Sequence, residues 1–494
     1  QKTAYEIRLS LVGSEMCIRD RLYAILKKSH TNKQNKKFIQ MKSTKKTTYL
    51  LIGILLVSVI FVSCKSQSET SKQTYDTTKY YDENESYWAQ FLPNVNPSLD
   101  KDIEVDVAVI GGGYTGLSAA YHIKKSNPSL KVAIFEAKRV GNGASGRNGS
   151  LVLAQTYSEG GFVMGDHKKY HKEIYDITVA SMKRIKALAE STGIDPDYVL
   201  NGQCLGIFNP DNIKSSKEYV EAAKELGMPI EYWEKEKAIN MLGSPGLVGA
   251  VYDPNGGTVN PGKLVAALKK LAEDVGVVIY ENSPVWGYTE GETITLPVVV
   301  KDTKYQVKAK SIVIAANAYA SKTLGFLDND IEPSHTQVSV TEPLTEEQYQ
   351  KAGWKNQIAW YDDQYAGTDA DATFHMVMTS DRRIVIGGGS VEYNEDDGLL
   401  YPGDLKKIEE QIAHRIGELY PSLKGIKIEK TWDGIIAETK SKNERIGVTG
   451  KNKNIYYALG YNGGQGVNVA FLFGELVSKL YNGEHHPLLD IYTE

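Results

Sequence analysis

The sequence predicts an α/β protein with one parallel sheet and a second, mainly antiparallel sheet. Residues 105–126 have the pattern of a buried strand, a glycine-rich turn and a helix, and residues 454–481 repeat that order far along the chain. Between them, residues 336–342, 373–378 and 383–386 alternate in polarity or are β-branched, as antiparallel strands are. Strand–turn–helix units build parallel sheets. Because residues 336–342, 373–378 and 383–386 are instead typical of antiparallel strands, they indicate a separate domain.

The stretch that organises the chain is residues 105–140, VDVAVIGGGYTGLSAAYHIKKSNPSLKVAIFEAKRV. Gly111 permits a tight bend, Gly113 lets the backbone approach a pyrophosphate, and Gly116 lets the helix pack on the strand. The amino end of the helix favours negative charge. Glu136 ends the next strand, where it can accept hydrogen bonds from ribose hydroxyls and repel a 2′-phosphate. These features predict a Rossmann-type site for an unphosphorylated adenine dinucleotide.

The next stretch, residues 141–150, is rich in glycine and other small residues. Small residues let the backbone lie against a flat ring, and Ser145, Arg147 and Asn148 supply hydrogen-bond donors. The same composition also suits a surface loop, so a ring-binding role and a structural role both stay open.

Further elements follow from hydrophobic spacing. Helices are expected over residues 173–192 and 214–226, from Asn260 onward, and over residues 405–419, and buried strands over residues 277–280 and 311–318. Asn260 precedes Pro261, the order expected of an N-cap and the first helical position. The repeat of strand, glycine loop and helix at residues 454–481 suits a ligand longer than one nucleotide.

Composition excludes some classes of function. The chain has 494 residues, enough for two or three domains, and its net charge of −4 gives no electrostatic case for nucleic-acid binding. Its three cysteines, Cys17, Cys64 and Cys204, match neither a zinc site nor a disulfide framework, so no metal is expected. Cys204 is expected to be a small buried side chain.

The amino-terminal residues have their own pattern. Residues 5–21 resemble the translation of a sequencing adapter joined upstream of a gene, so residues 1–40 are expected to be a non-native leader. Residues 41–64 then combine early lysines with an apolar run that is shorter than a membrane span, as in an export signal.

The end of this signal, residues 61–64 (FVSC), resembles a bacterial lipobox, which implies acylation of Cys64 after cleavage. An uncleaved signal anchor is the alternative. Residues 65–86 are polar enough for a flexible linker. We therefore expect a lipoprotein anchored to the membrane in the bacterial cell envelope, with a cytoplasmic protein as the alternative.

Together these motifs resemble the FAD-dependent oxidoreductases of the D-amino-acid oxidase and glycine oxidase superfamily, most closely the gamma-glutamylputrescine oxidoreductase-like branch. The similarity extends over about residues 86–483. The motifs that carry it are SYW at residues 86–88, VIGGGYTGLSAAY at 109–121, GNGASGRNG at 141–149, GTVNPGKL at 257–264, VIAANAY at 313–319, TEPL at 341–344 and GYNGGQGVN at 460–468.

The resemblance implies a discontinuous FAD-binding domain, residues 87–160, 258–332 and 425–494, and a substrate domain, residues 161–257 and 333–424, with a mainly antiparallel sheet. FAD is expected to be bound noncovalently, because no cysteine matches the covalent attachment of sarcosine oxidases. The residues expected to bind it are Gly111, Gly113, Tyr114, Thr115, Gly116, Glu136, Ala137, Ser145, Arg147, Asn148, Gly149, Val285, Ala316, Asn317, Gly464, Gln465, Gly466 and Val467.

The chain departs from the family pattern at several positions. Ser150 stands where glycine is usual, Gln465 where histidine is common, and Glu444 where proline is normal. Ile436 falls where amino-acid oxidases place an arginine that binds the substrate carboxylate. That replacement favours an amine whose charge lies elsewhere over an α-amino acid.

The expected reaction is oxidation of the C–N bond of an amine or amino acid by hydride transfer to flavin N5, which gives an imine that hydrolyses. The substrate is a small molecule, and O2 or a quinone is the electron acceptor. Candidate substrate contacts, chosen from domain position, are His335, Tyr361, His375 and Trp432. The alternatives are a nicotinamide-dependent Rossmann dehydrogenase and a non-catalytic flavin-binding electron-transfer protein.

Overall fold

The computed structural model describes residues 85–154, 168–363, 374–388, 405–440, 443–461 and 466–492. The expected leader and signal with Cys64 lie outside the described residues, as do Gly464 and Gln465. Within the described ranges, no helix has the length and apolarity that crossing a membrane requires.

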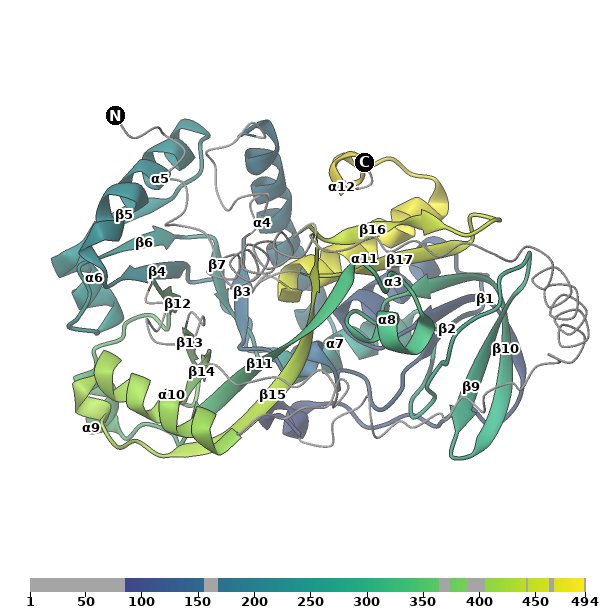
Figure 1. Cartoon of the computed structure of the whole chain (residues 1–494), viewed down its shortest axis with the longest axis horizontal. Coiled ribbons are helices and arrows are strands. Elements are labelled where there is room, and N and C mark those ends of the chain that lie inside the picture. The colour runs from purple at the N-terminus through teal and green to yellow at the C-terminus, as the bar shows by residue number, and fades with distance from the viewer. Residues whose placement is uncertain are drawn as a thin grey trace, which may run out of the picture. The chain divides into compact units, whose positions relative to one another are not determined.

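The first sheet has the strand order β16-β17-β10-β1-β2-β8, with β9 paired to β10 (Figure 1). Strands β17, β10, β1, β2 and β8 run parallel, whereas β16 and β9 are antiparallel to their neighbours. The strands are β1 (Ile103–Ile110), β2 (Val132–Phe135), β8 (Val278–Tyr280), β9 (Ile294–Val300), β10 (Thr303–Ile314), β16 (Arg445–Thr449) and β17 (Ile455–Leu459).

The parallel arrangement explains why motifs far apart in the sequence come together. The carboxyl ends of parallel strands lie at one edge of a sheet, where ligands bind in open α/β folds. The turn at residues 111–113 follows β1, Glu136 follows β2, residues 315–317 follow β10, and Gly460 follows β17. The fold therefore places four of the sequence motifs at the same edge.

Two helices of this region pack closely against each other. They are α3 (Tyr114–Ser126), after the first glycine turn, and α11 (Gly466–Asn482), after the last. Gly474 makes the contact possible, because a Cβ atom there would lie 2.5 Å from both the Ser118 side chain and the Thr115 carbonyl oxygen. Ser118 also donates a hydrogen bond to the Phe471 carbonyl (2.6 Å). The start of α11 is thereby fixed beside the start of α3.

The second sheet has the order β15-β11-β14-β13-β12-β4-β6-β5, and all its pairs are antiparallel except β12 with β4. Its strands are β4 (Gln203–Ile207), β5 (Glu231–Glu234), β6 (Gly249–Asp253), β11 (Ile331–Thr341), β12 (Ala359–Asp362), β13 (His375–Met378), β14 (Ile384–Gly387) and β15 (Ile428–Thr439). The predicted fold class, a parallel sheet with a second, mainly antiparallel one, is confirmed. A two-stranded ribbon joins β3 (Leu151–Leu153) to β7 (Gly256–Thr258).

Strand β15 lies within residues 425–494, which were expected in the cofactor domain. It pairs along its length with β11 of the second sheet. Figure 1 shows the two long strands side by side. Their far ends contribute Ile331, Ile435 and Ala437 to a buried cluster that also contains Ile110 and Ile312 of the parallel sheet. The pair therefore belongs to one sheet and packs into the core of the other.

The remaining helices are α4 (Lys168–Glu190), α5 (Ile213–Glu225), α6 (Lys235–Leu242), α7 (Pro261–Asp274), α8 (Tyr319–Leu324), α9 (Glu346–Ala352), α10 (Leu405–Leu419) and α12 (Pro487–Tyr492). The helix predicted over residues 405–419 is confirmed with those bounds. Asn260 caps α7 as predicted, since its side chain accepts a hydrogen bond from the Lys263 amide (3.1 Å). Cys204 is a buried free thiol, as expected.

Candidate active site

A cavity of about 670 Å³ lies at the edge where β1, β2 and β10 end and extends to the second sheet. Its size is in the range of cofactor and ligand sites. Every predicted cofactor residue within the described ranges lines it except Gly116. Those on the wall are Gly111, Gly113, Tyr114, Thr115, Glu136, Ala137, Ser145, Arg147, Asn148, Gly149, Val285, Ala316, Asn317, Gly466 and Val467.

The first turn leaves no room for side chains. Gly111 has φ +106°, and a Cβ there would lie 2.7 Å from the Ala315 carbonyl oxygen. At Gly113 a Cβ would lie 2.9 Å from Ser145 Oγ, and at Gly116 it would overlap the Gly111 carbonyl. Gly116 therefore has the packing role that its position predicts, away from the cavity wall. Residues 111–113 therefore present backbone atoms without side chains to the part of the cavity where a pyrophosphate is expected.

Glu136 stands at the end of β2 with its carboxylate directed to this turn. Its two oxygens accept hydrogen bonds from the amides of Gly112 (2.7 Å) and Lys138 (3.0 Å). Burial raises the pKa of Glu136 to about 7, although these two hydrogen bonds act in the opposite direction. Donors from a ligand, such as ribose hydroxyls, would stabilise the ionised form, so this carboxylate fits the predicted role.

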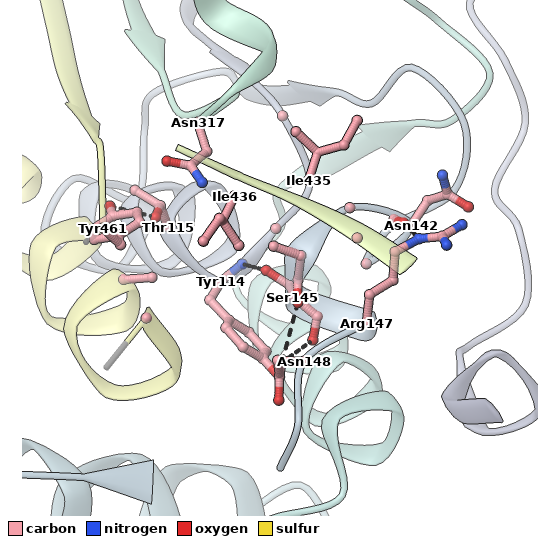
Figure 2. A pocket seen from close by; sticks show the side chains of 18 of the residues that line it. Tyr114, Thr115, Asn142, Ser145, Arg147, Asn148, Asn317, Ile435, Ile436 and Tyr461 are labelled. Carbon is pink, nitrogen blue, oxygen red and sulfur yellow. Dashed lines mark hydrogen bonds between the residues drawn. The ribbon is translucent and has the colours of Figure 1, made fainter. Parts of the chain in front are cut away.

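The amino end of α3 is braced by hydroxyl groups. The Tyr114 amide donates to Ser145 Oγ (3.0 Å), and Thr115 Oγ1 forms a hydrogen bond with the hydroxyl of Tyr461 (2.6 Å), as Figure 2 shows. Tyr461 begins the last glycine loop and also lines the cavity. The first and last motifs of the sequence are thus joined directly at the helix start, where first-turn amides are available to an anion.

The loop at residues 141–150 is held in shape by Asn148. The Asn148 side chain donates to the carbonyls of Ala144 (3.2 Å) and Ser145 (3.0 Å), and its oxygen accepts from the Ser150 amide (3.0 Å). Ser150 has φ +70° and is 2% exposed. Left-handed backbone favours glycine, which explains why glycine is the usual residue of the family here.

Asn317 joins two further motifs on the cavity wall. It follows β10 with φ +44°, and its side-chain oxygen accepts a hydrogen bond from the Gly460 amide (2.9 Å). Gly460 directly follows β17. The small residues after β10 and the last glycine loop are therefore parts of one surface.

The second sheet supplies the opposite wall through Tyr361 and His375. These residues are directly opposed on β12 and β13, and both side chains line the cavity. Burial lowers the pKa of His375 to about 4 and raises that of Tyr361 to about 12. At neutral pH both groups are therefore uncharged. Their position agrees with the expectation that they face a substrate.

His375 is closely confined by two glycines. A Cβ on Gly149 would lie 2.5 Å from His375 Nε2, and a Cβ on Gly387 would overlap the imidazole. Gly149 belongs to the loop after β2, whereas Gly387 ends β14. The imidazole of His375 is thus held between the loop at residues 141–150 and strand β14 of the second sheet.

Two of the candidate substrate contacts lie elsewhere. His335 is on β11 with its side chain directed to Asp433 (Nδ1 to Oδ2, 3.3 Å), and neither residue lines the cavity. Trp432 is fully buried, and its indole Nε1 donates to the Arg147 carbonyl (2.8 Å) behind the wall. Neither residue lines this cavity, because alternation along β11 turns the His335 side chain away and Trp432 is packed in the core, so their contact with a substrate stays a prediction.

Residues of the wall that sequence reasoning missed include Leu153, Thr336 and Val338. Thr336 and Val338 occupy alternate positions of β11, so the period-two pattern of that strand defined their common face. The period-two pattern does not indicate which face of β11 lines the cavity. The identity of that face depends on the packing of the two sheets.

The fold and the site define a dinucleotide-binding α/β protein with a ligand cavity between its two sheets. Residues 106–480 match the sequence model of the family described as FAD dependent oxidoreductase. Gamma-glutamylputrescine oxidoreductase of Escherichia coli (strain K12) is 30% identical over 420 residues, which are 83% of this chain and 90% of that protein. The beta subunit of sarcosine oxidase from an Arthrobacter species is 25% identical over 408 residues, 80% of this chain and 90% of that subunit.

Solved structures agree in fold. The crystal structure of glycine oxidase from Geobacillus kaustophilus superposes with a TM-score of 0.62 at 21% identity and covers 78% of this chain and 96% of its own. The chain belongs to the FAD dependent oxidoreductase family. This finding confirms the predicted class of protein and its cofactor, and it sets aside the nicotinamide-dependent alternative.

Proposed function

We propose that this protein oxidises the C–N bond of an amine whose reacting carbon carries no carboxylate, with noncovalently bound FAD. The observation that carries the proposal is that Ile436 lines the cavity, since the family resemblance places an arginine of amino-acid oxidases at this position. An aliphatic side chain cannot pair with a carboxylate, whereas a guanidinium binds one through two hydrogen bonds. The similarity to gamma-glutamylputrescine oxidoreductase supports an amine, because putrescine is a diamine.

The charges around the cavity support the same substrate class. Among its described lining residues, the charged side chains are Glu136 and Arg147. The Arg147 guanidinium donates to the carbonyls of Asn142 (2.7 Å) and Asp433 (3.0 Å), so it is engaged by the protein itself. His375 is neutral at pH 7 because burial lowers its pKa to about 4. Tyr361, His375 and Ile436 on the second-sheet wall therefore offer no cation to pair with a carboxylate, and the N–H groups of Arg147 that bind Asn142 and Asp433 are already occupied.

The role of each wall follows from its chemistry. FAD, when bound, supplies the acceptor for a hydride from the carbon that bears the nitrogen. Tyr361 and His375 can hold the neutral amine by hydrogen bonds, since both are uncharged polar groups facing the cavity. The apolar side chains of Val338 and Ile436 exclude water. Orientation and desolvation are thus the contributions of this chain.

The direct test is an anaerobic spectral screen of the purified protein with polyamines, acylated polyamines, N-methyl amino acids and D-amino acids. The amines are expected to bleach the flavin absorbance, and the α-amino acids to do so at least tenfold more slowly. Ile436→Arg should reverse this preference, because a paired guanidinium and carboxylate contribute about 1.5–3 kcal/mol. Ile436→Met is the control, with similar volume and no charge.

Two results would contradict the proposal. Faster bleaching by α-amino acids than by amines in the unmodified protein would overturn the substrate class. No bleaching across the whole panel would instead favour a flavin-binding electron-transfer protein. Release of free FAD on acid precipitation tests noncovalent binding, because a covalent flavin would stay with the pellet.

The proposal extends to location and electron acceptor. Acylation at Cys64, which lies outside the described residues, would hold the enzyme at the membrane of the cell envelope, where either O2 or a membrane quinone can reoxidise the flavin. Incorporation of labelled palmitate and its loss in Cys64→Ser test the anchor. A protein that incorporates no label and fractionates with the soluble extract would support the cytoplasmic alternative. Rates of reoxidation by O2 and by a soluble quinone analogue identify the acceptor.

A further inference from the structure

Three consecutive backbone carbonyls of the ring-binding loop, those of residues 146–148, each accept a hydrogen bond from a distant side chain. Ser86 Oγ donates to the first (2.6 Å), Trp432 Nε1 to the second (2.8 Å) and Trp88 Nε1 to the third (3.0 Å). Ser86 and Trp88 belong to the SYW motif, and Trp432 belongs to β15. Two segments more than 300 residues apart thus hold one short stretch of backbone.

The donors form a rigid support behind the cavity wall. Trp88 and Trp432 are 1% and 0% exposed, and their rings pack edge to face with centroids 6.3 Å apart. Ser86 is also buried. None of the three lines the cavity. Their indole and hydroxyl groups therefore contact the loop from the side opposite the ligand.

This support determines where the amides of the loop point. In a trans peptide the carbonyl of one residue and the N–H of the next point in opposite directions, and the described residues contain no cis peptide. The carbonyls of residues 146–148 face the Ser86 hydroxyl and the two indoles, so the amides of residues 147–149 point away from these donors. The Arg147 amide closes a turn on the Ala144 carbonyl (3.2 Å). Within the described chain, the amides of Asn148 and Gly149 have no acceptor, and both residues line the cavity.

Two amide donors on a cavity wall fit a ligand that gains negative charge. Fixed N–H dipoles stabilise developing charge without reorganisation, most strongly where water is excluded. Reduction adds electron density to the flavin ring, so donors held against the ring favour the reduced form. Donors free to rotate away would give less stabilisation.

We propose that Ser86, Trp88 and Trp432 are positioning residues that aim the Asn148 and Gly149 amides at the flavin ring and so raise its reduction potential. The inference rests on FAD binding in this cavity and is independent of the substrate. It also gives the SYW motif a role, since two of its residues hold the loop although they lie outside the cavity wall.

The test compares Trp88→Phe and Trp432→Phe with the unmodified enzyme in a redox titration of the bound flavin. Each change keeps an aromatic ring but removes the N–H, so one loop carbonyl loses its partner and the following amide loses its fixed direction. The reduced form should be disfavoured at least tenfold, a fall in midpoint potential of about 30 mV for two electrons. The double variant should show a larger fall, with a shifted visible flavin spectrum.

Trp354→Phe is the matched control. Trp354 is also buried, at 2% exposed, and its Nε1 donates to the Ile358 carbonyl (2.9 Å), but it lies in a different cluster and does not line the cavity. This variant should lose stability and keep the original potential. An unchanged potential and spectrum in the Trp88 and Trp432 variants, with only a loss of stability like that of the control, would overturn the proposal.

Ser86→Ala removes a single hydroxyl and carries the test if the tryptophan variants do not fold. It should lower the potential in the same direction, and an unchanged potential in that case would reject the positioning role. Failure of the cofactor assignment is a separate result, because then the unmodified protein would be colourless and would not bind added FAD.

Discussion

The two walls of the cavity are built in different ways. The wall on the parallel sheet consists of backbone, with glycine turns that carry no side chain and peptide groups held by hydrogen bonds to Ser145, Asn148 and the buried indoles. The wall on the second sheet consists of side chains, chiefly Tyr361, His375 and Ile436, and these are uncharged. A backbone wall tolerates little change because its shape is fixed by steric limits. A side-chain wall can change its specificity without a change of fold.

The largest expected effect is that of Gly111→Ala in the backbone wall. The added Cβ would lie 2.7 Å from the Ala315 carbonyl, and φ +106° is strained for alanine. We expect FAD affinity to fall more than 100-fold, or no flavin to be retained, in titrations followed by flavin fluorescence. Gly193→Ala is the control, since Gly193 has φ +81° with open space around it. It should cost about 1–2 kcal/mol of stability and leave the affinity unchanged. Equal losses in both variants would contradict a steric role for the turn.

The second prediction concerns the contact between the walls at His375. Gly387→Ala places a Cβ on an imidazole that Gly149 already confines from the other side, so the ring cannot move away. The free energy of unfolding, measured by thermal denaturation, should fall by about 1–3 kcal/mol, the usual cost of overpacking. The double variant Gly387→Ala with His375→Ser should recover much of it, with a coupling energy of at least 0.5 kcal/mol. Additive losses would show that His375 does not fill this space.

The third prediction is a pH dependence of FAD affinity from Glu136. Burial raises the pKa of Glu136 from an ordinary 4.5 to about 7, so the protein without FAD holds a proton there below pH 7. Ribose hydroxyls favour the ionised form, and binding therefore releases this proton. Affinity should rise between pH 5 and 7 and level off above it. Glu136→Gln should bind about tenfold more weakly at pH 8, a loss of about 1.4 kcal/mol, with a flat pH profile. An unmodified protein with a flat profile would contradict this role.

The smallest expected effect is a gain of stability in Ser150→Gly. Ser150 has φ +70°, and its buried hydroxyl has no hydrogen-bond partner in the described structure. Glycine removes both costs but adds chain entropy to the unfolded state, so the net gain should be about 1 kcal/mol. Chemical denaturation measures it, and Ser150→Ala is the control that removes the hydroxyl alone. A loss of stability on glycine substitution would show that the serine has a contact of its own.

The same contrast explains what the sequence predicted. A glycine turn has steric requirements that are visible in a short motif, and an acidic residue at the end of the next strand is visible in the same way. The sequence alone therefore predicted that Gly111, Gly113 and Glu136 belong to one site, and all three line the cavity. On the second sheet a residue's role depends on which face of its strand meets the cavity. Tyr361 and His375, chosen from domain position alone, line the cavity, whereas His335 and Trp432, chosen in the same way, do not.

The strand β15 shows a second limit of sequence reasoning. No strand was predicted over residues 428–439, and the structure shows one there that pairs with β11. Long-range pairing of two strands about 100 residues apart leaves no local signal in either strand. The residues that join the two sheets were therefore the least predictable part of the fold.

The β11–β15 pair also has a consequence for how the protein comes apart. Ile331, Ile435 and Ala437 belong to a buried cluster of the parallel sheet, while the same two strands hydrogen-bond into the other sheet. Neither half can melt without exposing apolar surface of its neighbour. Heating should therefore give a single calorimetric transition, and two separate transitions would contradict this coupling.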